Sequence, residues 1–70
     1  MIEMFDYVLR SSMDKHKIVA IVYLKKNNEM TQRNIKITKI KDNDIEAYCY
    51  LRHQLRHFKK NNILSAFHIQ

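Results

Sequence analysis

The pattern of hydrophobic positions predicts a helix at the start of the chain. An apolar stripe at helical spacing runs through residues 1–14 and is formed by Ile2, Phe5, Val8, Leu9 and Ser12 or Met13. Glu3, Asp6 and Arg10 lie outside this stripe. A membrane-surface helix would show the same stripe, but this polar face is net acidic and anionic lipid would repel it. We therefore expect a helix that packs on the body of the protein.

Three further segments have the pattern of β-strands. Residues 18–24 are rich in β-branched side chains and apolar on both faces, which is typical of a central strand covered on two sides. Residues 31–40 alternate loosely, with isoleucines on one side and residues such as Lys36 on the other, as in a half-buried strand. Residues 63–69 alternate as well and predict a final strand.

Residues 45–60 fit two structures. In a strand, the odd-numbered positions from Ile45 to Leu51 form one apolar face. In a helix, an apolar stripe runs through Ile45, Tyr48, Leu51, Leu55 and Phe58. The aromatic residues favour a strand, and the Glu, Ala, Leu, Arg and Gln residues favour a helix. Periodicity alone does not decide between them.

Composition limits the class of protein. The chain has 70 residues, enough for one domain with a thin core, and 46% of them are hydrophobic, too many for a disordered segment. The absence of glycine excludes glycine-rich phosphate-binding loops. Turns that need a positive φ must use Asn or Asp, which cluster at residues 27–28, 42–44 and 61–62.

Cellular location follows from what the sequence lacks. A single cysteine, Cys49, rules out an intrachain disulfide and favours a reducing cytoplasm. We find no apolar run of about 18 residues that would span a membrane. We also find no basic segment followed by an apolar run of the kind that marks secretion. The sequence therefore predicts a cytoplasmic protein with no membrane partner.

Charge is unevenly distributed along the chain. Thirteen Lys and Arg against seven Asp and Glu give a net charge of +6. Residues 1–14 sum to −2, residues 15–41 to +7 and residues 47–70 to +4. An acidic start followed by a basic remainder indicates a body that faces a polyanion. The lysines taken alone are equally consistent with an ordinary solvated surface.

The segment that was ambiguous by periodicity resembles a known family. It contains the motif A-Y-C-x-x-R-x-x-x-R-x-F, formed by Ala47, Tyr48, Cys49, Arg52, Arg56 and Phe58. This spacing resembles that of the WYL domain family, and the likeness extends over roughly residues 16–69. The Trp-Tyr-Leu tripeptide that names the family is not retained, since Asn43-Asp44-Ile45 occupies its place.

The resemblance implies a mainly β fold in a single domain, residues 1–70. A short N-terminal helix over residues 1–14 would precede a small five-stranded barrel of SH3 or Sm type over residues 16–69. WYL domains are regarded as modules of bacterial regulators that sense ligands or nucleic acids through a basic groove with arginines. The arginines that match are Arg52 and Arg56. We therefore expect a regulatory binding module, in transcriptional or related regulation, and not an enzyme.

The expected binding site combines arginines, tyrosines and lysines. Arg52 and Arg56 bracket a tight turn at His53-Gln54, where two convergent guanidinium groups suit phosphate. Tyr48 and Tyr50 would stack on bases, which favours single-stranded nucleic acid over duplex. Longer-range attraction would come from Lys36, Lys39, Lys41, Lys59 and Lys60. The alternatives are arginines paired with nearby acids and tyrosines that pack as ordinary core residues.

Other readings of the same residues stay open. If residues 45–60 were a helix, Arg52, Arg56 and Lys59 would enter a DNA groove, and Cys49, His53 and His57 would lie on one side and suit zinc. We expect no metal, no cofactor and no catalytic residue. The ligand would be nucleic acid or a phosphorylated small molecule. The alternative function is a protein–protein adaptor that docks on an acidic partner or adds a strand, and a core this small also suits a homo-oligomer.

Overall fold

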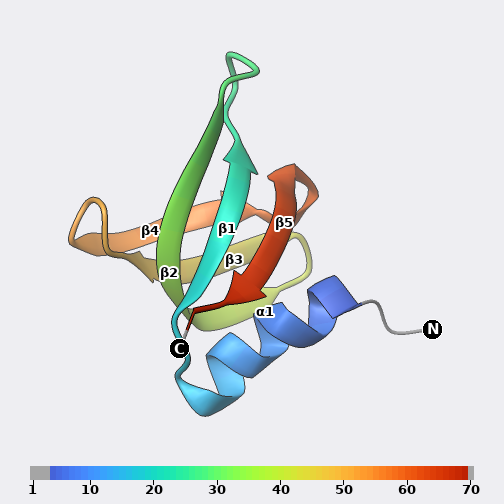
Figure 1. Ribbon diagram of the computed structural model, residues 1–70, viewed down its shortest axis with the longest axis vertical. Coiled ribbons are helices and arrows are strands. Elements are labelled where there is room, and N and C mark those ends of the chain that lie inside the picture. Colours follow the sequence, from blue (N-terminus) through green and yellow to red (C-terminus); the bar gives the residue numbers. More distant parts are fainter. Residues whose placement is uncertain (1–3, 70) are drawn as a thin grey trace.

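The computed structural model describes residues 4–69 and shows one helix followed by five antiparallel strands in a single sheet (Figure 1). The elements in chain order are the helix α1 (Met4–Lys15), the strands β1 (Val19–Leu24), β2 (Met30–Lys41), β3 (Asp44–Cys49) and β4 (Gln54–Lys59), the short 3₁₀ helix η1 (Lys60–Asn62) and the strand β5 (Ile63–His68). The mainly β prediction is confirmed. No helix among the described residues is long and apolar enough to cross a membrane.

The sheet curls on itself because β2 is long and bent. Its strand order is β4-β3-β2-β1-β5. The first half of β2 pairs with β1 up to Ile35, and the second half pairs with β3 from Ile35 onward, with a register shift between Ile37 and Lys39. An irregularity of this kind sharpens the local bend of a strand. In Figure 1, β3 and β4 consequently pass behind β1 and β2 at a steep angle, as expected for a small SH3- or Sm-type barrel.

The core fills the space inside the curled sheet. Its fully buried members include Val19 and Ile21 from β1, Ile35 from β2, and Ile45 and Cys49 from β3. These residues alternate along their strands, so each strand turns one side inward and the other outward. The prediction that β1 is apolar on both faces holds for its first half, where the intervening Ala20 is also fully buried.

Helix α1 covers the end of the barrel at which β1 begins and β5 ends (Figure 1). Val8 and Leu9 are buried against the sheet, and Met13 packs beside them. The predicted stripe is therefore confirmed for these three residues, although the helix ends at Lys15 rather than at residue 14. Ile2 and the side chain of Phe5 lie outside what the structure describes.

Residues 45–60 form a β-hairpin, so the helical alternative is wrong. The pairing runs from Asp44 opposite Lys59 to Cys49 opposite Gln54. The turn occupies residues 50–53, and Gln54 is already the first residue of β4. The predicted turn at His53-Gln54 is thus placed too late in the chain. The backbone reverses with His53 in the left-handed region, at a φ of 55°.

Asn and Asp provide the tight turns of a chain that has no glycine. Asn28 and Asp42 adopt φ values of 65° and 53° in the turns before β2 and β3, as expected from their clusters. His16 takes the same conformation after α1. The third cluster behaves differently from the prediction, because residues 61–62 belong to the 3₁₀ helix η1 between β4 and β5.

Candidate functional site

A basic pocket opens where the β1–β2 hairpin meets the end of β4. Its volume is about 490 Å³. No acidic residue of the described chain lines it, and its walls hold five cationic side chains, Lys25, Lys26, Arg33, Arg56 and Lys59. A concave surface lined by one sign of charge concentrates ions of the opposite sign. This pocket, called the basic pocket below, therefore favours an anion.

The bend of the sheet brings the two arginines together. Arg33 in β2 lies opposite Ile21, and Arg56 in β4 lies opposite Ala47. Residues directly opposite each other on neighbouring strands project from the same face. Because Ile21 and Ala47 are fully buried, both arginines lie on the inner face of the sheet. They come from strands separated by β3, so only the curvature of the barrel places them at one pocket.

Two aromatic rings form a rigid wall of the basic pocket. The rings of Tyr23 and Phe58 meet edge to face, with centroids 5.0 Å apart and planes at 81°. The backbone N–H of Lys59 donates a hydrogen bond to the hydroxyl of Tyr23 at 3.2 Å. These contacts join β1 to β4, which are not neighbours in the sheet. These contacts between β1 and β4 hold this wall of the pocket in place.

Arg33 carries a buried charge whose partners are neutral. Its side chain is only 7% exposed. Its Nε lies 3.5 Å from the hydroxyl of Thr31, and its Nη1 lies 3.8 Å from the sulfur of Cys49. Within residues 4–69 no carboxylate forms an ion pair with Arg33. Buried charges in proteins are normally paired, so the unneutralised charge of this guanidinium favours binding of an anion.

The thiol of Cys49 lies beside the guanidinium of Arg33, which affects its pKa. Burial raises the pKa of its thiol, but hydrogen bonds from the backbone N–H of Arg52, the guanidinium of Arg33 and the backbone N–H of Leu51 lower it by more. The net pKa therefore lies below its usual value. The thiol is fully buried. It contacts Arg33 from the core side and is not accessible to solvent.

The predicted site residues do not all meet at the basic pocket. Arg56 and Lys59 line it, and Arg52 does not. Arg52 is an exposed residue of the turn between β3 and β4. The arginine that lines the pocket with Arg56 is Arg33.

The predicted aromatic residues lie on the outer face of the sheet. Tyr48 is opposite Lys36 on one side and Leu55 on the other, one position out of phase with buried Ala47. The rings of Tyr48 and Tyr50 meet edge to face at 4.9 Å. The fold therefore divides the predicted residues between two surfaces, with Tyr48, Tyr50 and Lys36 on the outer face and Arg56 and Lys59 at the basic pocket.

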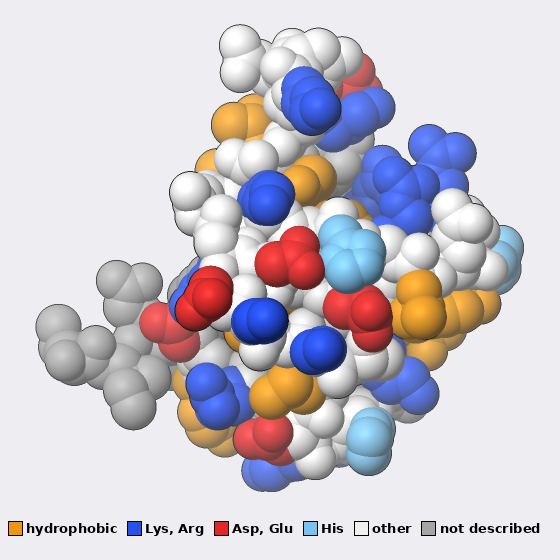
Figure 2. Space-filling model, turned by 180° about the vertical axis from the view of Figure 1, so that it is seen from behind, with side chains coloured by type: hydrophobic (Ala, Val, Ile, Leu, Met, Phe, Trp, Pro, Cys, Tyr) orange, Lys and Arg blue, Asp and Glu red, His pale blue; other side chains and the backbone are white. Residues whose placement is uncertain are grey.

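The acidic residues near the hairpin contact a histidine instead of the arginines. Nδ1 of His57 lies 2.9 Å from a carboxylate oxygen of Asp44, and its Nε2 lies 3.8 Å from Glu46. Figure 2 shows the molecule from behind, with acidic, histidine and basic side chains side by side on this face. Among residues 4–69, no three His, Cys, Asp or Glu side chains are grouped to hold a metal ion. Basic side chains on this face are therefore interspersed with acidic ones, whereas no acidic residue of the described chain lines the basic pocket.

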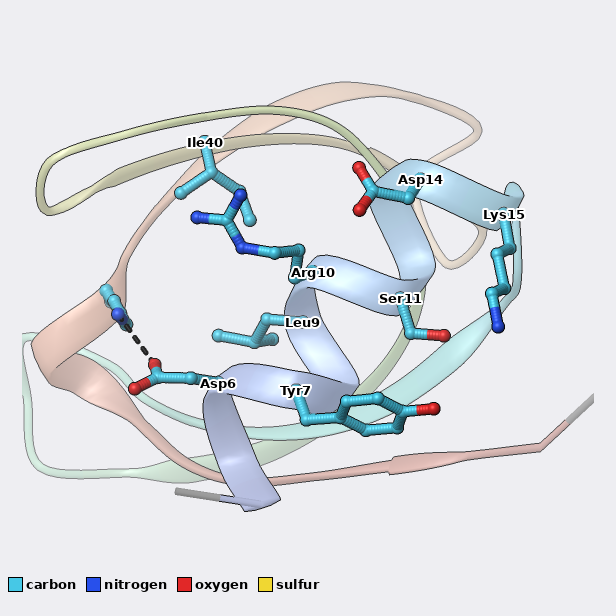
Figure 3. Close-up of a pocket in the computed structure, with 9 residues that line it drawn as sticks. Asp6, Tyr7, Leu9, Arg10, Ser11, Asp14, Lys15 and Ile40 are labelled. Atoms are coloured by element: carbon cyan, nitrogen blue, oxygen red, sulfur yellow. Dashed lines mark ion pairs between the residues drawn. The ribbon is translucent and has the colours of Figure 1, made fainter. Parts of the chain in front are cut away.

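A second hollow, of about 560 Å³, lies beside α1 (Figure 3). Its walls mix both signs of charge, and Lys60 pairs with Asp6 at 2.7 Å. In Figure 3, Arg10 and Asp14 project from the helix along the same hollow, with Ile40 on its far side. Since opposite charges line it together, this hollow has no preference for an anion.

Sequence reasoning missed Arg33, although a signal was present. In the strand predicted over residues 31–40, Ile35 and Ile37 define the buried face, and Arg33 falls on the same alternating positions. A charged residue at a buried position of a strand needs hydrogen-bond or ionic partners, and this requirement marks Arg33 as a candidate site residue. Lys25 and Lys26 precede the turn cluster at residues 27–28, and nothing in the sequence places that turn beside β4.

Comparisons with known proteins support the fold. No family model matches the chain, and no curated protein matches it. Among solved structures, proteasome accessory factor B/C (PafBC) of Arthrobacter aurescens is similar, with a TM-score of 0.77 and 18% sequence identity. The likeness covers 90% of this chain and 11% of that one. At this level of identity the comparison shows that the chain shares the fold of part of that protein.

Proposed function

We propose that this chain is a non-catalytic regulatory module that binds a phosphate-bearing ligand in the basic pocket. The observation that carries the proposal is the buried guanidinium of Arg33, which has neutral partners and shares the pocket with Arg56. Guanidinium groups present a planar fork of donors that matches phosphate oxygens. The resemblance of the motif at residues 47–58 to WYL domains, together with a fold shared with part of PafBC, supports a regulatory role.

Nucleic acid is the ligand we favour, and single strands over duplex. The pocket is concave, and Lys25, Lys26 and Lys59 at its rim add positive charge for a chain that continues beyond one phosphate. A phosphodiester strand can enter such a hollow when its bases are unpaired, whereas a duplex is too wide. A phosphorylated small molecule would use the same arginines and leave the rim lysines without a contact.

Fluorescence anisotropy with a labelled ten-nucleotide single strand tests the proposal. We expect binding to wild-type protein that inorganic pyrophosphate displaces. Arg56→Gln should weaken it about tenfold, because a hydrogen bond to a charged group contributes about 1.5 kcal/mol or more. The matched control is Arg52→Gln, a nearby exposed arginine outside the basic pocket, for which we expect a change below about twofold.

The probes separate the ligand classes. A labelled duplex of the same length should bind more weakly than the single strand, and pyrophosphate binding without strand binding would identify a small phosphorylated ligand. If Arg52→Gln weakened binding and Arg56→Gln did not, the site would be the hairpin turn and the assignment to the basic pocket would be wrong. Absence of binding to every phosphate-bearing probe would overturn the function itself.

A further inference from the structure

The strand β5 leaves one edge of the sheet open. The strand order ends with β4 on one side and β5 on the other, and among the described residues β5 pairs with β1 alone. Figure 1 shows β5, in red, at this margin of the sheet. An edge strand presents unpaired backbone N–H and C=O groups to any strand that approaches.

The two edges of the sheet differ in charge. The strand β4 carries Arg56 and Lys59, cations of the kind that normally keep an edge from pairing. The strand β5 contains no Asp, Glu, Lys or Arg in its six residues. Its exposed residues are the uncharged Leu64, Ser65 and Phe67 together with His68, and Phe67 is 46% exposed. The edge at β5 therefore lacks the protection that the edge at β4 has.

Backbone geometry identifies the groups that are free to pair. The N–H of Ile69 donates to the carbonyl of Ile18 at 3.4 Å, so Ile69 faces inward toward the β1 side. In an antiparallel ladder successive residues alternate in direction, so Phe67 also faces β1 and the amides of Ala66 and His68 face outward. A register shift near Ile63 limits the regular edge to the residues that follow it.

We propose that β5 pairs with β5 of a second copy of this chain, antiparallel, about a two-fold axis at Phe67. In this register Ala66 of each copy lies opposite His68 of the other, and these outward-facing residues exchange backbone hydrogen bonds. The two Phe67 residues face each other in a non-hydrogen-bonded pair, where opposing side chains approach most closely. A five-stranded sheet in each copy becomes one continuous sheet across the dimer.

The lack of Asp, Glu, Lys and Arg on β5 argues for a second copy as the occupant. Each chain carries +6, so two copies repel over most of their surfaces, but not at this strand. A two-fold interface uses the same patch on both copies, and a strand without these charged residues is compatible with itself. The two imidazoles of His68 stay apart, since each is opposite Ala66. An acidic peptide would find no cation on this strand to attract it.

The proposal is independent of the basic pocket. That pocket is built from the other end of β1, the turn that follows it, Arg33 of β2 and the strand β4, and β5 contributes none of its lining. Because the paired strands run antiparallel, the two basic pockets of a dimer would lie at opposite ends of the shared sheet. Loss of the dimer should therefore leave phosphate binding in place, and loss of phosphate binding should leave the dimer in place.

Cross-linking and sedimentation of the full chain test the pairing. Phe67→Cys should give a disulfide-linked dimer under mild oxidation, because the two-fold axis places these positions opposite each other. The matched control is Leu55→Cys, a somewhat more exposed position on the other edge strand β4 (56%), which should give no dimer above wild type. Wild-type protein controls for Cys49, which is buried.

A second variant removes the pairing without removing a backbone hydrogen bond within the monomer. Ala66→Pro deletes an outward-facing amide, a position where an edge strand tolerates proline. We expect it to sediment as a monomer with an unchanged circular dichroism spectrum, at a concentration where wild type is a dimer. Wild-type protein that is monomeric, or that forms larger assemblies with no Phe67→Cys cross-link, as pairing of β5 with β4 would give, overturns the proposal.

Discussion

Arg33 is a buried cation that forms no ion pair with any carboxylate of residues 4–69. The guanidinium of Arg33 is held by a hydroxyl and a thiol, which satisfy donors but do not neutralise its charge. Replacement of a buried charge by an apolar side chain of similar volume is often neutral or stabilising. We therefore expect Arg33→Met to leave the free energy of unfolding unchanged or to raise it by about 1 kcal/mol, as measured by urea denaturation.

The same variant separates a binding role from a structural one. Pyrophosphate should raise the melting temperature of wild-type protein, because a ligand of the native state stabilises it by mass action. Arg33→Met should lose most of that increase, although it folds. A loss of about 3 kcal/mol of stability without ligand would show instead that Arg33 is part of the framework of the fold.

Cys49 makes stability depend on pH in a direction that can be measured. Its pKa in the folded protein lies below the usual value, so the folded state releases the thiol proton more readily than the unfolded state does. The resulting stabilisation grows as pH rises from neutral toward about 8.5, the ordinary thiol pKa, and is lost as pH falls. The difference in unfolding free energy between wild type and Cys49→Ala should therefore widen over this range. A difference that stays flat or narrows would contradict it.

Among the elements, the join between α1 and the sheet depends on one hydroxyl. Ser12 is fully buried, donates to the carbonyl of Lys17 at 2.7 Å and accepts from the N–H of Ile37 at 3.0 Å. Ser12→Ala leaves both backbone groups without that partner and should cost about 2 kcal/mol. In a domain of this size the melting temperature should fall by about 10 °C.

The neighbouring serine provides the control for this join. Ser11 is also buried, but within residues 4–69 its hydroxyl makes no hydrogen bond. Ser11→Ala should therefore change the unfolding free energy by less than about 1 kcal/mol. Equal losses in the two variants would mean that helix propensity or packing, and not the hydrogen bonds of Ser12, holds α1 to the sheet.

The order of the elements could largely be predicted from the sequence, because most segments have one dominant period. Residues 45–60 could not be assigned in this way, because both the two-residue period of a strand and the 3.6-residue period of a helix place apolar residues on one face. The resemblance to WYL domains favoured strands there, and the observed hairpin agrees. The position of its turn was predicted wrongly because His53 adopts a left-handed conformation. In a chain without glycine, we expected that conformation only at Asn and Asp.

For the whole molecule, curvature explains why the candidate site could be predicted only in part. Arg56 and Lys59 were named from the motif, but their neighbour Arg33 comes from a strand two positions away in the sheet. The face on which each residue lies depends on the pairing register between neighbouring strands, and this register could not be predicted from the sequence. Tyr48 and Arg56 belong to one motif and still lie on opposite faces.

Salt dependence distinguishes the two faces in solution. With a net charge of +6, some attraction to any polyanion is expected, but each bound phosphate adds about 0.7 to the slope of log affinity against log salt for a single strand. Arg56→Gln at the basic pocket should lower the slope by about that amount. Lys36→Gln beside Tyr48 on the outer face should leave it unchanged. If Lys36→Gln lowered the slope and Arg56→Gln did not, the nucleic acid would bind along the outer face that holds Tyr48, Tyr50 and Lys36, and not in the basic pocket.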